Sequence, residues 1–149
     1  MSTTVLSASP ESTYQLGETI GQTLRGDETI FLSGDLGAGK TLFTKGIAAA
    51  LDIDASEVVS PTFTLMNRLE GKHVLYHFDL YRLGERIGGY LPEIDDYIGE
   101  GIMVIEWAQY LEPAYFGIKN ALDIRFLVTD EDTRRIEILA HPAYIKIPK

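Results

Sequence analysis

The sequence predicts an α/β fold of three layers, with a mostly parallel central sheet, antiparallel additions at an edge and a C-terminal β-hairpin. Short apolar runs alternate with segments of helical periodicity, which is typical of a parallel sheet covered by helices. A glycine-rich segment joins one such run, residues 29–33, to a helical pattern. Two strand-like runs, residues 121–129 and 134–141, flank a polar turn at 130–133 and indicate the hairpin.

One domain is the expected organisation of residues 1–149, because a chain of this length can enclose one core but not two comfortable ones. Its 45% hydrophobic and 23% charged residues are ordinary for a globular protein. We expect no membrane span and no secretory leader. The sequence has no cysteine, which excludes disulfides and thiolate chemistry. These features favour a cytoplasmic location.

The charge balance argues against direct binding of nucleic acid. The formal net charge is −9, and the 13 Lys and Arg residues are scattered along the chain. A nucleic-acid binder normally carries a basic patch, since neutralisation of phosphates supplies most of its affinity. We therefore expect that this chain alone does not bind RNA or DNA directly and tightly.

The N-terminal segment predicts an edge strand, residues 3–8, followed by a helix. Ser9 is a suitable N-cap residue, with Pro10 in the first turn. The apolar stripe of this helix consists of Leu16, Ile20 and Leu24. Residues 25–27, Arg-Gly-Asp, should end the helix and lead into the next strand.

The octapeptide Gly34-Asp35-Leu36-Gly37-Ala38-Gly39-Lys40-Thr41 matches the phosphate-binding loop, or P-loop, pattern G-x-x-x-x-G-K-[ST]. Glycines let successive backbone N–H groups point at phosphate oxygens, and the following helix directs its positive end at the same anion. Lys40 adds a charge for the β- and γ-phosphates, and the Thr41 hydroxyl can ligate Mg²⁺. The expected fold is therefore P-loop NTPase-like, and the expected ligands are a nucleoside triphosphate, which the resemblance below identifies as ATP, and Mg²⁺.

The remaining segments complete the predicted sheet. The expected order is a loop at 52–60, a strand at 63–69, a turn at 70–72, a strand at 73–79, loops with one or two short helices at 84–101, a buried strand at 102–106, and an extended surface tail at 142–149.

Two acids close predicted strands, Asp79 after residues 74–78 and Glu106 after residues 102–105. Ligands of open α/β sheets bind beyond the carboxyl ends of the strands. An acid there can anchor Mg²⁺ or orient the attacking water of a P-loop enzyme. The alternative is that each acid is only a charged residue at the surface end of a strand.

Further candidates lie near these acids. Thr62, within residues 60–64, stands where a switch threonine or a plain strand entrance would lie. Arg82 is either a phosphate contact or, as we favour, a member of a structural ion pair. Trp107 is a core residue, a platform for adenine or a partner, or a lid. His73, His77 and His141 lack ligand-like spacing, and we expect them to be structural.

Four motifs together resemble the bacterial TsaE (YjeE) family of small P-loop ATPases. They are the octapeptide 34–41, Ser60-Pro61-Thr62-Phe63-Thr64-Leu65, His77-Phe78-Asp79-Leu80-Tyr81-Arg82-Leu83 and Ile105-Glu106-Trp107. Members are required for making threonylcarbamoyladenosine in tRNA, and the resemblance covers about residues 12–140. It departs at Leu42, where many members have Thr or Ser, and at Ala108, which replaces a frequent Pro.

The resemblance implies a role for each matching residue. Lys40, Asp79 and Glu106 would be catalytic, with Thr41 and Glu106 serving the metal. Thr62 would be switch-like, and Trp107 would matter for activity. The implied nucleotide-binding residues are Thr13, Gly37, Ala38, Gly39, Lys40, Thr41 and Leu42. The implied partners are the TsaD and TsaB proteins, whose complex ATP hydrolysis would cycle rather than perform the transfer.

Three other functions remain open from the residues alone. A small-molecule kinase would need an acceptor pocket, usually rich in arginine, and residues 84–101 contain only Arg86. A GTPase switch usually carries an Asn/Thr-Lys-x-Asp element, and the closest match, residues 44–47, lacks the Asp. A nucleotide-binding module without catalysis would not need the paired acids.

Overall fold

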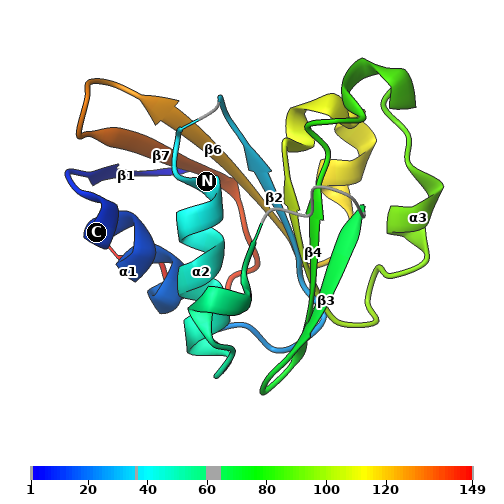
Figure 1. Ribbon diagram of the computed structural model, residues 1–149, viewed down its shortest axis with the longest axis horizontal. Coiled ribbons are helices and arrows are strands. Elements are labelled where there is room, and N and C mark those ends of the chain that lie inside the picture. Colours follow the sequence, from blue (N-terminus) through cyan, green and yellow to red (C-terminus); the bar gives the residue numbers. More distant parts are fainter. Residues whose placement is uncertain (1, 36, 60–64, 149) are drawn as a thin grey trace.

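The computed structural model describes residues 2–35, 37–59 and 65–148. Within them, seven strands form one mixed sheet in the order β1-β7-β6-β2-β5-β4-β3 (Figure 1). The strands are β1 (Thr3–Ser7), β2 (Thr29–Ser33), β3 (Met66–Glu70), β4 (Val74–Asp79), β5 (Ile102–Glu106), β6 (Ala121–Val128) and β7 (Arg134–Ala140).

The centre of the sheet is parallel and both of its sides are antiparallel. Strand β2 pairs in parallel with β5 and β6, and β4 pairs in parallel with β5. The antiparallel pairs are β1 with β7, β6 with β7, and β3 with β4. The α/β prediction and the C-terminal hairpin are confirmed, and antiparallel strands flank the centre on both sides rather than at one edge. The finer three-layer, P-loop NTPase-like assignment stays a prediction.

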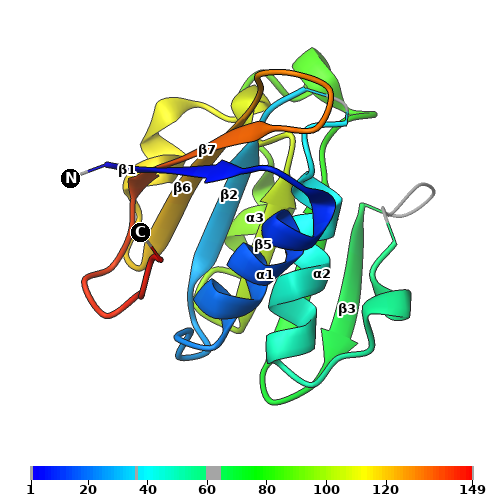
Figure 2. The ribbon, with the colours of Figure 1, turned by 90° about the vertical axis from the view of Figure 1, so that its left-hand side faces the viewer.

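The two longest helices of the described residues pack side by side against one face of the sheet (Figure 2). They are α1 (Pro10–Gly21) and α2 (Lys40–Ala50). Ser9 caps α1 as expected, because its hydroxyl oxygen accepts the Ser12 N–H at 3.1 Å. The helices approach closely: a Cβ on Gly46 would lie 2.1 Å from the Tyr14 carbonyl oxygen.

Short helices accompany the opposite face of the sheet. They are α3 (Pro92–Asp95), η2 (Gly84–Ile87), η3 (Ala108–Tyr110) and η4 (Pro113–Gly117), while η1 (Ala55–Glu57) follows α2. Each face therefore has its own hydrophobic cluster. Ile30, Phe43 and Ile47 belong to the cluster beneath α1 and α2, and Phe31 and Phe78 belong to the other. The short helices also confirm the expectation for residues 84–101.

The C-terminal tail and one strand differ from the prediction. The tail makes a turn at Pro142, with the Ile145 N–H donating to the Pro142 carbonyl oxygen at 3.1 Å. Its Ile145 side chain is only 4% exposed and joins the core, because it covers apolar surface beneath α1. The prediction of a surface tail at 142–149 is therefore wrong at Ile145, whereas Ala143, Lys146 and Pro148 are exposed as expected. Strand β3 begins at Met66 rather than residue 63, and residues 63 and 64 lie outside the described residues.

Within the described residues, no helix combines the length and the hydrophobicity that crossing a membrane requires.

Candidate functional site

The glycine-rich loop connects the end of β2 to the start of α2. Strand, loop and helix follow one another as expected, with β2 ending at Ser33 and α2 beginning at Lys40. Gly37 and Gly39 have φ angles of 76° and 102°, a left-handed region that side chains disfavour. This conformation explains the glycines of the motif. The loop lies at the carboxyl end of β2, where α/β sheets bind ligands.

Lys40 folds its side chain over the loop and is only 5% exposed. Its ammonium donates to the carbonyl oxygens of Gly34 at 2.6 Å and Asp35 at 2.8 Å. It also lies 4.3 Å from the centre of the Trp107 ring, within cation–π range. Burial lowers the pKa of Lys40, whereas nearby carboxylates, Glu106 foremost, act in the opposite direction. An ammonium has three N–H donors, so one remains for a phosphate oxygen.

Glu106 is the buried acid of the site. It ends β5, is 2% exposed, and one of its carboxylate oxygens, Oε1, accepts the Thr41 hydroxyl at 2.8 Å. The predicted metal residues Thr41 and Glu106 are therefore in direct contact. A hydroxyl and a carboxylate are the oxygen ligands that Mg²⁺ takes in P-loop sites. No group of three or more His, Cys, Asp or Glu side chains suited to a metal occurs in the described ranges.

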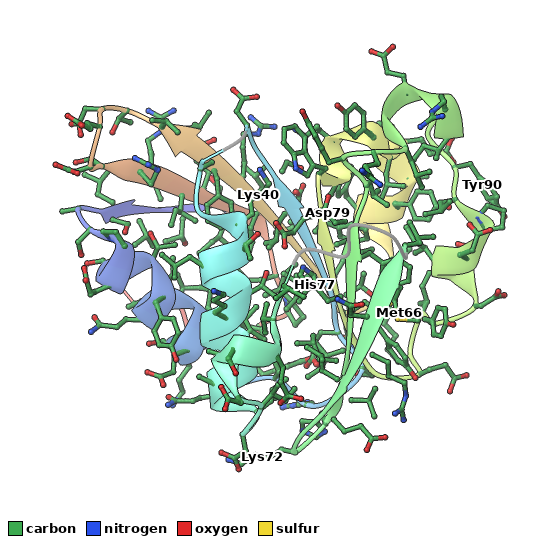
Figure 3. The ribbon with its side chains drawn as sticks, viewed as in Figure 1. Lys40, Met66, Lys72, His77, Asp79 and Tyr90 are labelled. Atoms are coloured by element: carbon green, nitrogen blue, oxygen red, sulfur yellow. The ribbon has the colours of Figure 1, made fainter. Side chains whose placement is uncertain are left out.

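Asp79 lies beside Glu106, because β4 and β5 pair in parallel with these two residues in register. Its Oδ1 accepts the Tyr81 N–H at 2.9 Å. Burial raises the pKa of Asp79 and the Glu106 charge raises it further, although the Tyr81 N–H acts in the opposite direction. Figure 3 shows Lys40 and Asp79 toward the same end of the sheet, far from Lys72. The three predicted catalytic residues are thus brought together.

His77 is a member of this site that the sequence did not reveal. From the sequence we expect all three histidines to be structural, but His77 Nε2 lies 2.5 Å from Glu106 Oε2. The side chain is fully buried in β4. A usable signal was present, since residues two apart on a strand face the same side, and His77 precedes Asp79 by two. His141 Nδ1, by contrast, lies 2.7 Å from the Pro142 carbonyl oxygen.

The Trp107 ring covers the Lys40 ammonium, and Tyr81 and Tyr110 pack against that ring. The Trp107 ring centre lies 4.7 Å from that of Tyr81 and 6.0 Å from that of Tyr110. Trp107 has a left-handed φ of 60°, which turns the chain sharply after Glu106. Of the three readings of Trp107, this geometry favours a cover or platform over a plain core residue.

A cavity of about 210 Å³ adjoins the loop on the side of α1. Four of the expected nucleotide-binding residues line it, namely Thr13, Gly37, Gly39 and Leu42. The Thr13 hydroxyl lies 2.7 Å from that of Ser7, and Ala38 is fully buried behind the loop. Four of the seven residues that the resemblance placed near a nucleotide therefore share one cavity, and their role in binding stays a prediction.

Two residues distant in sequence also contact the loop. Arg134, at the start of β7, donates through Nε and Nη2 to the Gly37 carbonyl oxygen at 3.2 and 3.1 Å. Gln109 donates its amide to the Gly34 carbonyl oxygen at 3.1 Å and accepts the Gly34 N–H at 3.3 Å. Nothing in the local sequence marks either residue, since both contacts depend on how the chain folds.

Of the two remaining candidates, Arg82 and Thr62, the structure describes Arg82. Arg82 is exposed after β4, and its carbonyl oxygen accepts an Arg86 N–H at 2.7 Å. Its functional role stays a prediction. Thr62 lies outside the described residues.

Comparisons with known proteins agree on one family. The family model described as "Threonylcarbamoyl adenosine biosynthesis protein TsaE" matches residues 7–136. A tRNA threonylcarbamoyladenosine biosynthesis protein TsaE from Aquifex aeolicus is 44% identical over 138 residues, covering 90% of this chain and 93% of that protein. The TsaE of Nostoc is 40% identical over 145 residues, covering 91% and 85%. A crystal structure of Bacillus subtilis YdiB matches with a TM-score of 0.73 at 27% identity, covering 95% and 87%.

Proposed function

The chain belongs to the TsaE family of tRNA threonylcarbamoyladenosine biosynthesis proteins, and from this premise we propose that it is the Mg²⁺-dependent ATPase of that machinery. One observation carries the proposal. Thr41 of the loop donates to Glu106, Glu106 and Asp79 end two adjacent parallel strands in register, and both acids interact electrostatically with Lys40. We likewise propose the three-layer P-loop NTPase-like assignment, because strand, glycine-rich loop and helix stand in that order.

The residues present suit ATP and Mg²⁺. The loop N–H groups and the Lys40 ammonium would hold phosphates, and the touching Thr41 and Glu106 oxygens would hold the metal. Bound Mg²⁺ would neutralise charge that develops on the transferred phosphoryl group. Asp79, held by one backbone N–H and raised in pKa, is suited to orient a water molecule and accept its proton.

We further propose that hydrolysis cycles a TsaB–TsaD complex between rounds, rather than making the modification. A chain of net charge −9 is poorly suited to hold tRNA, so a partner would hold it. On this proposal the protein is cytoplasmic, and it hydrolyses ATP slowly alone and faster with its partners.

The test is phosphate release from ATP, measured with and without TsaB, TsaD and tRNA. Lys40→Ala, Thr41→Ala and Glu106→Ala should each reduce turnover by at least about 100-fold, because each removes a group held at the phosphate or metal position. Lys45→Ala, on the same helix but outside these contacts, is the matched control. Wild-type turnover in all three site variants would refute the mechanism. Transfer of phosphate to a metabolite would identify a kinase instead.

A further inference from the structure

We infer that His77 is a positioning residue, which holds the Glu106 carboxylate in the orientation that hydrolysis needs. The inference rests on the proposed ATPase function and gives a role to a residue that we expected from the sequence to be structural. It follows from the contact between two buried side chains on neighbouring strands, His77 of β4 and Glu106 of β5.

The Glu106 carboxylate is held at both of its oxygens, from two different elements. Thr41 of α2 donates its hydroxyl to Oε1 at 2.8 Å, and His77 Nε2 lies 2.5 Å from Oε2. The side chains of His77 and Glu106 are 0% and 3% exposed, so water cannot replace this contact. With the second oxygen held by His77, the carboxylate cannot rotate away from Thr41 and the loop. Residues that support a metal ligand in this way commonly tune its activity.

The position of His77 is difficult to explain by stability alone. Leu75, two residues earlier on the same strand, is fully buried in the hydrophobic cluster, and an apolar side chain at position 77 would extend that surface. His77 Nδ1 is instead buried without a hydrogen-bond partner among the described residues. An unpaired buried polar atom costs free energy, of order 1–3 kcal/mol. Within the part of the chain that the structure describes, the one hydrogen bond of the imidazole is with Glu106, and it offsets this cost.

The contact also specifies where the imidazole proton lies. A carboxylate accepts hydrogen bonds, so holding Glu106 in this way requires a proton on His77 Nε2. In a neutral imidazole with that proton, Nδ1 carries a lone pair and no N–H. This tautomer distinguishes a residue that holds Glu106 from one that merely fills space.

Two substitutions separate the donor from the volume it occupies. His77→Leu fills the site without a donor, and His77→Gln retains an amide N–H that can reach the position of Nε2. We expect His77→Leu to lower kcat for ATP hydrolysis about 10- to 100-fold with little change in KM, and His77→Gln to recover most of the loss. Leu75→Ala controls for damage to β4: it should lower the melting temperature but not kcat. A folded His77→Leu with wild-type kcat would overturn the inference, as would equal losses in His77→Gln or Leu75→Ala.

A second measurement does not depend on turnover. Nitrogen-15 NMR of the imidazole rings in the nucleotide-free protein should show His77 protonated on Nε2, with a signal that moves in Glu106→Gln. Protonation on Nδ1 alone, or a signal unaffected by Glu106→Gln, would refute the contact. This result also separates the two proposals. Absence of ATP hydrolysis in the wild-type protein with its partners refutes the proposed function, whereas the NMR result still decides whether His77 holds Glu106.

Discussion

Asp79 and Glu106 end neighbouring strands in register, yet their surroundings differ. Glu106 is almost fully buried between two side-chain partners, Thr41 and His77. Asp79 is half-buried, and its one recorded hydrogen bond comes from the Tyr81 N–H. A carboxylate with two fixed partners suits a constant task such as holding a metal, and one with greater freedom suits proton transfer. The pair therefore supports a division of roles.

The raised pKa of Asp79 predicts how its removal changes stability with pH. Because the folded protein holds this proton more tightly than the unfolded chain, the ionised form lowers stability at neutral pH. The penalty is absent below the ordinary pKa of 3.8 and develops as pH rises through the folded value. Asp79→Asn should therefore raise the free energy of unfolding at pH 7, by about 0.5–1 kcal/mol after allowance for solvent screening. Urea denaturation at several pH values measures this.

Asp130 provides a control of opposite sign. Its carboxylate accepts the N–H groups of Asp132 and Thr133 in the β6–β7 turn, and these bonds lower its pKa. Asp130→Asn should thus lose stability at neutral pH, with a loss that fades as pH falls below the ordinary pKa. An Asp79→Asn protein less stable than wild type at pH 7 would contradict our account of Asp79.

At the scale of elements, α2, which begins at Lys40, approaches α1 closely at glycines. A Cβ on Gly46 would lie 2.1 Å from the Tyr14 carbonyl oxygen and 2.8 Å from the Glu18 nitrogen, both backbone atoms. The backbone of a packed helix cannot move aside as a flexible side chain can. A Cβ at position 46 would therefore force the two helices apart. The glycines are therefore required by packing, against their low helix propensity.

Gly46→Ala should accordingly destabilise the protein despite the better helix propensity of alanine. The gain in propensity is about 1 kcal/mol, and overpacking a tight contact costs about 1–3 kcal/mol or more. Denaturant unfolding should give a net loss of about 1–2 kcal/mol. Gly117→Ala is the matched control, since no described atom lies within 4 Å of its would-be Cβ. Stabilisation by Gly46→Ala would mean that the helices are less closely packed than described.

The sequence predicts those features that depend on neighbouring residues, and it does not predict those that depend on contacts between distant segments. The strands that carry Asp79 and Glu106 are readable because each is a local apolar run ending in an acid. Arg134 is different, since its contact with Gly37 joins residues 97 apart and depends on the path of the hairpin. The burial of Ile145 in the C-terminal tail was likewise not predictable, because it depends on a distant part of the fold. The burial of Ile145 depends on apolar surface supplied by the cluster beneath α1, which a short polar-flanked segment does not indicate.

At the scale of the whole molecule, charge is the feature with the clearest functional consequence. The net charge is −9, and several basic side chains are paired with acids: Arg68 with Glu70, and Arg125 and Arg135 with Glu137 at 3.8 and 3.2 Å. Such pairing offsets part of the positive charge, and the remaining excess of acids repels a polyanion.

This charge distribution predicts that the chain alone does not bind tRNA appreciably. In fluorescence anisotropy with labelled tRNA at about 0.1 M salt, we expect a Kd larger than about 10⁻⁴ M, which is weaker than ordinary non-specific binding. Adding TsaB and TsaD should bring the chain to tRNA, because the partners would then carry the phosphate contacts. The salt dependence of that assembly should be unchanged by Lys40→Ala, since the P-loop lysine would face a nucleotide rather than RNA. Micromolar binding by the chain alone, weakening steeply with salt, would mean that this protein holds the tRNA itself.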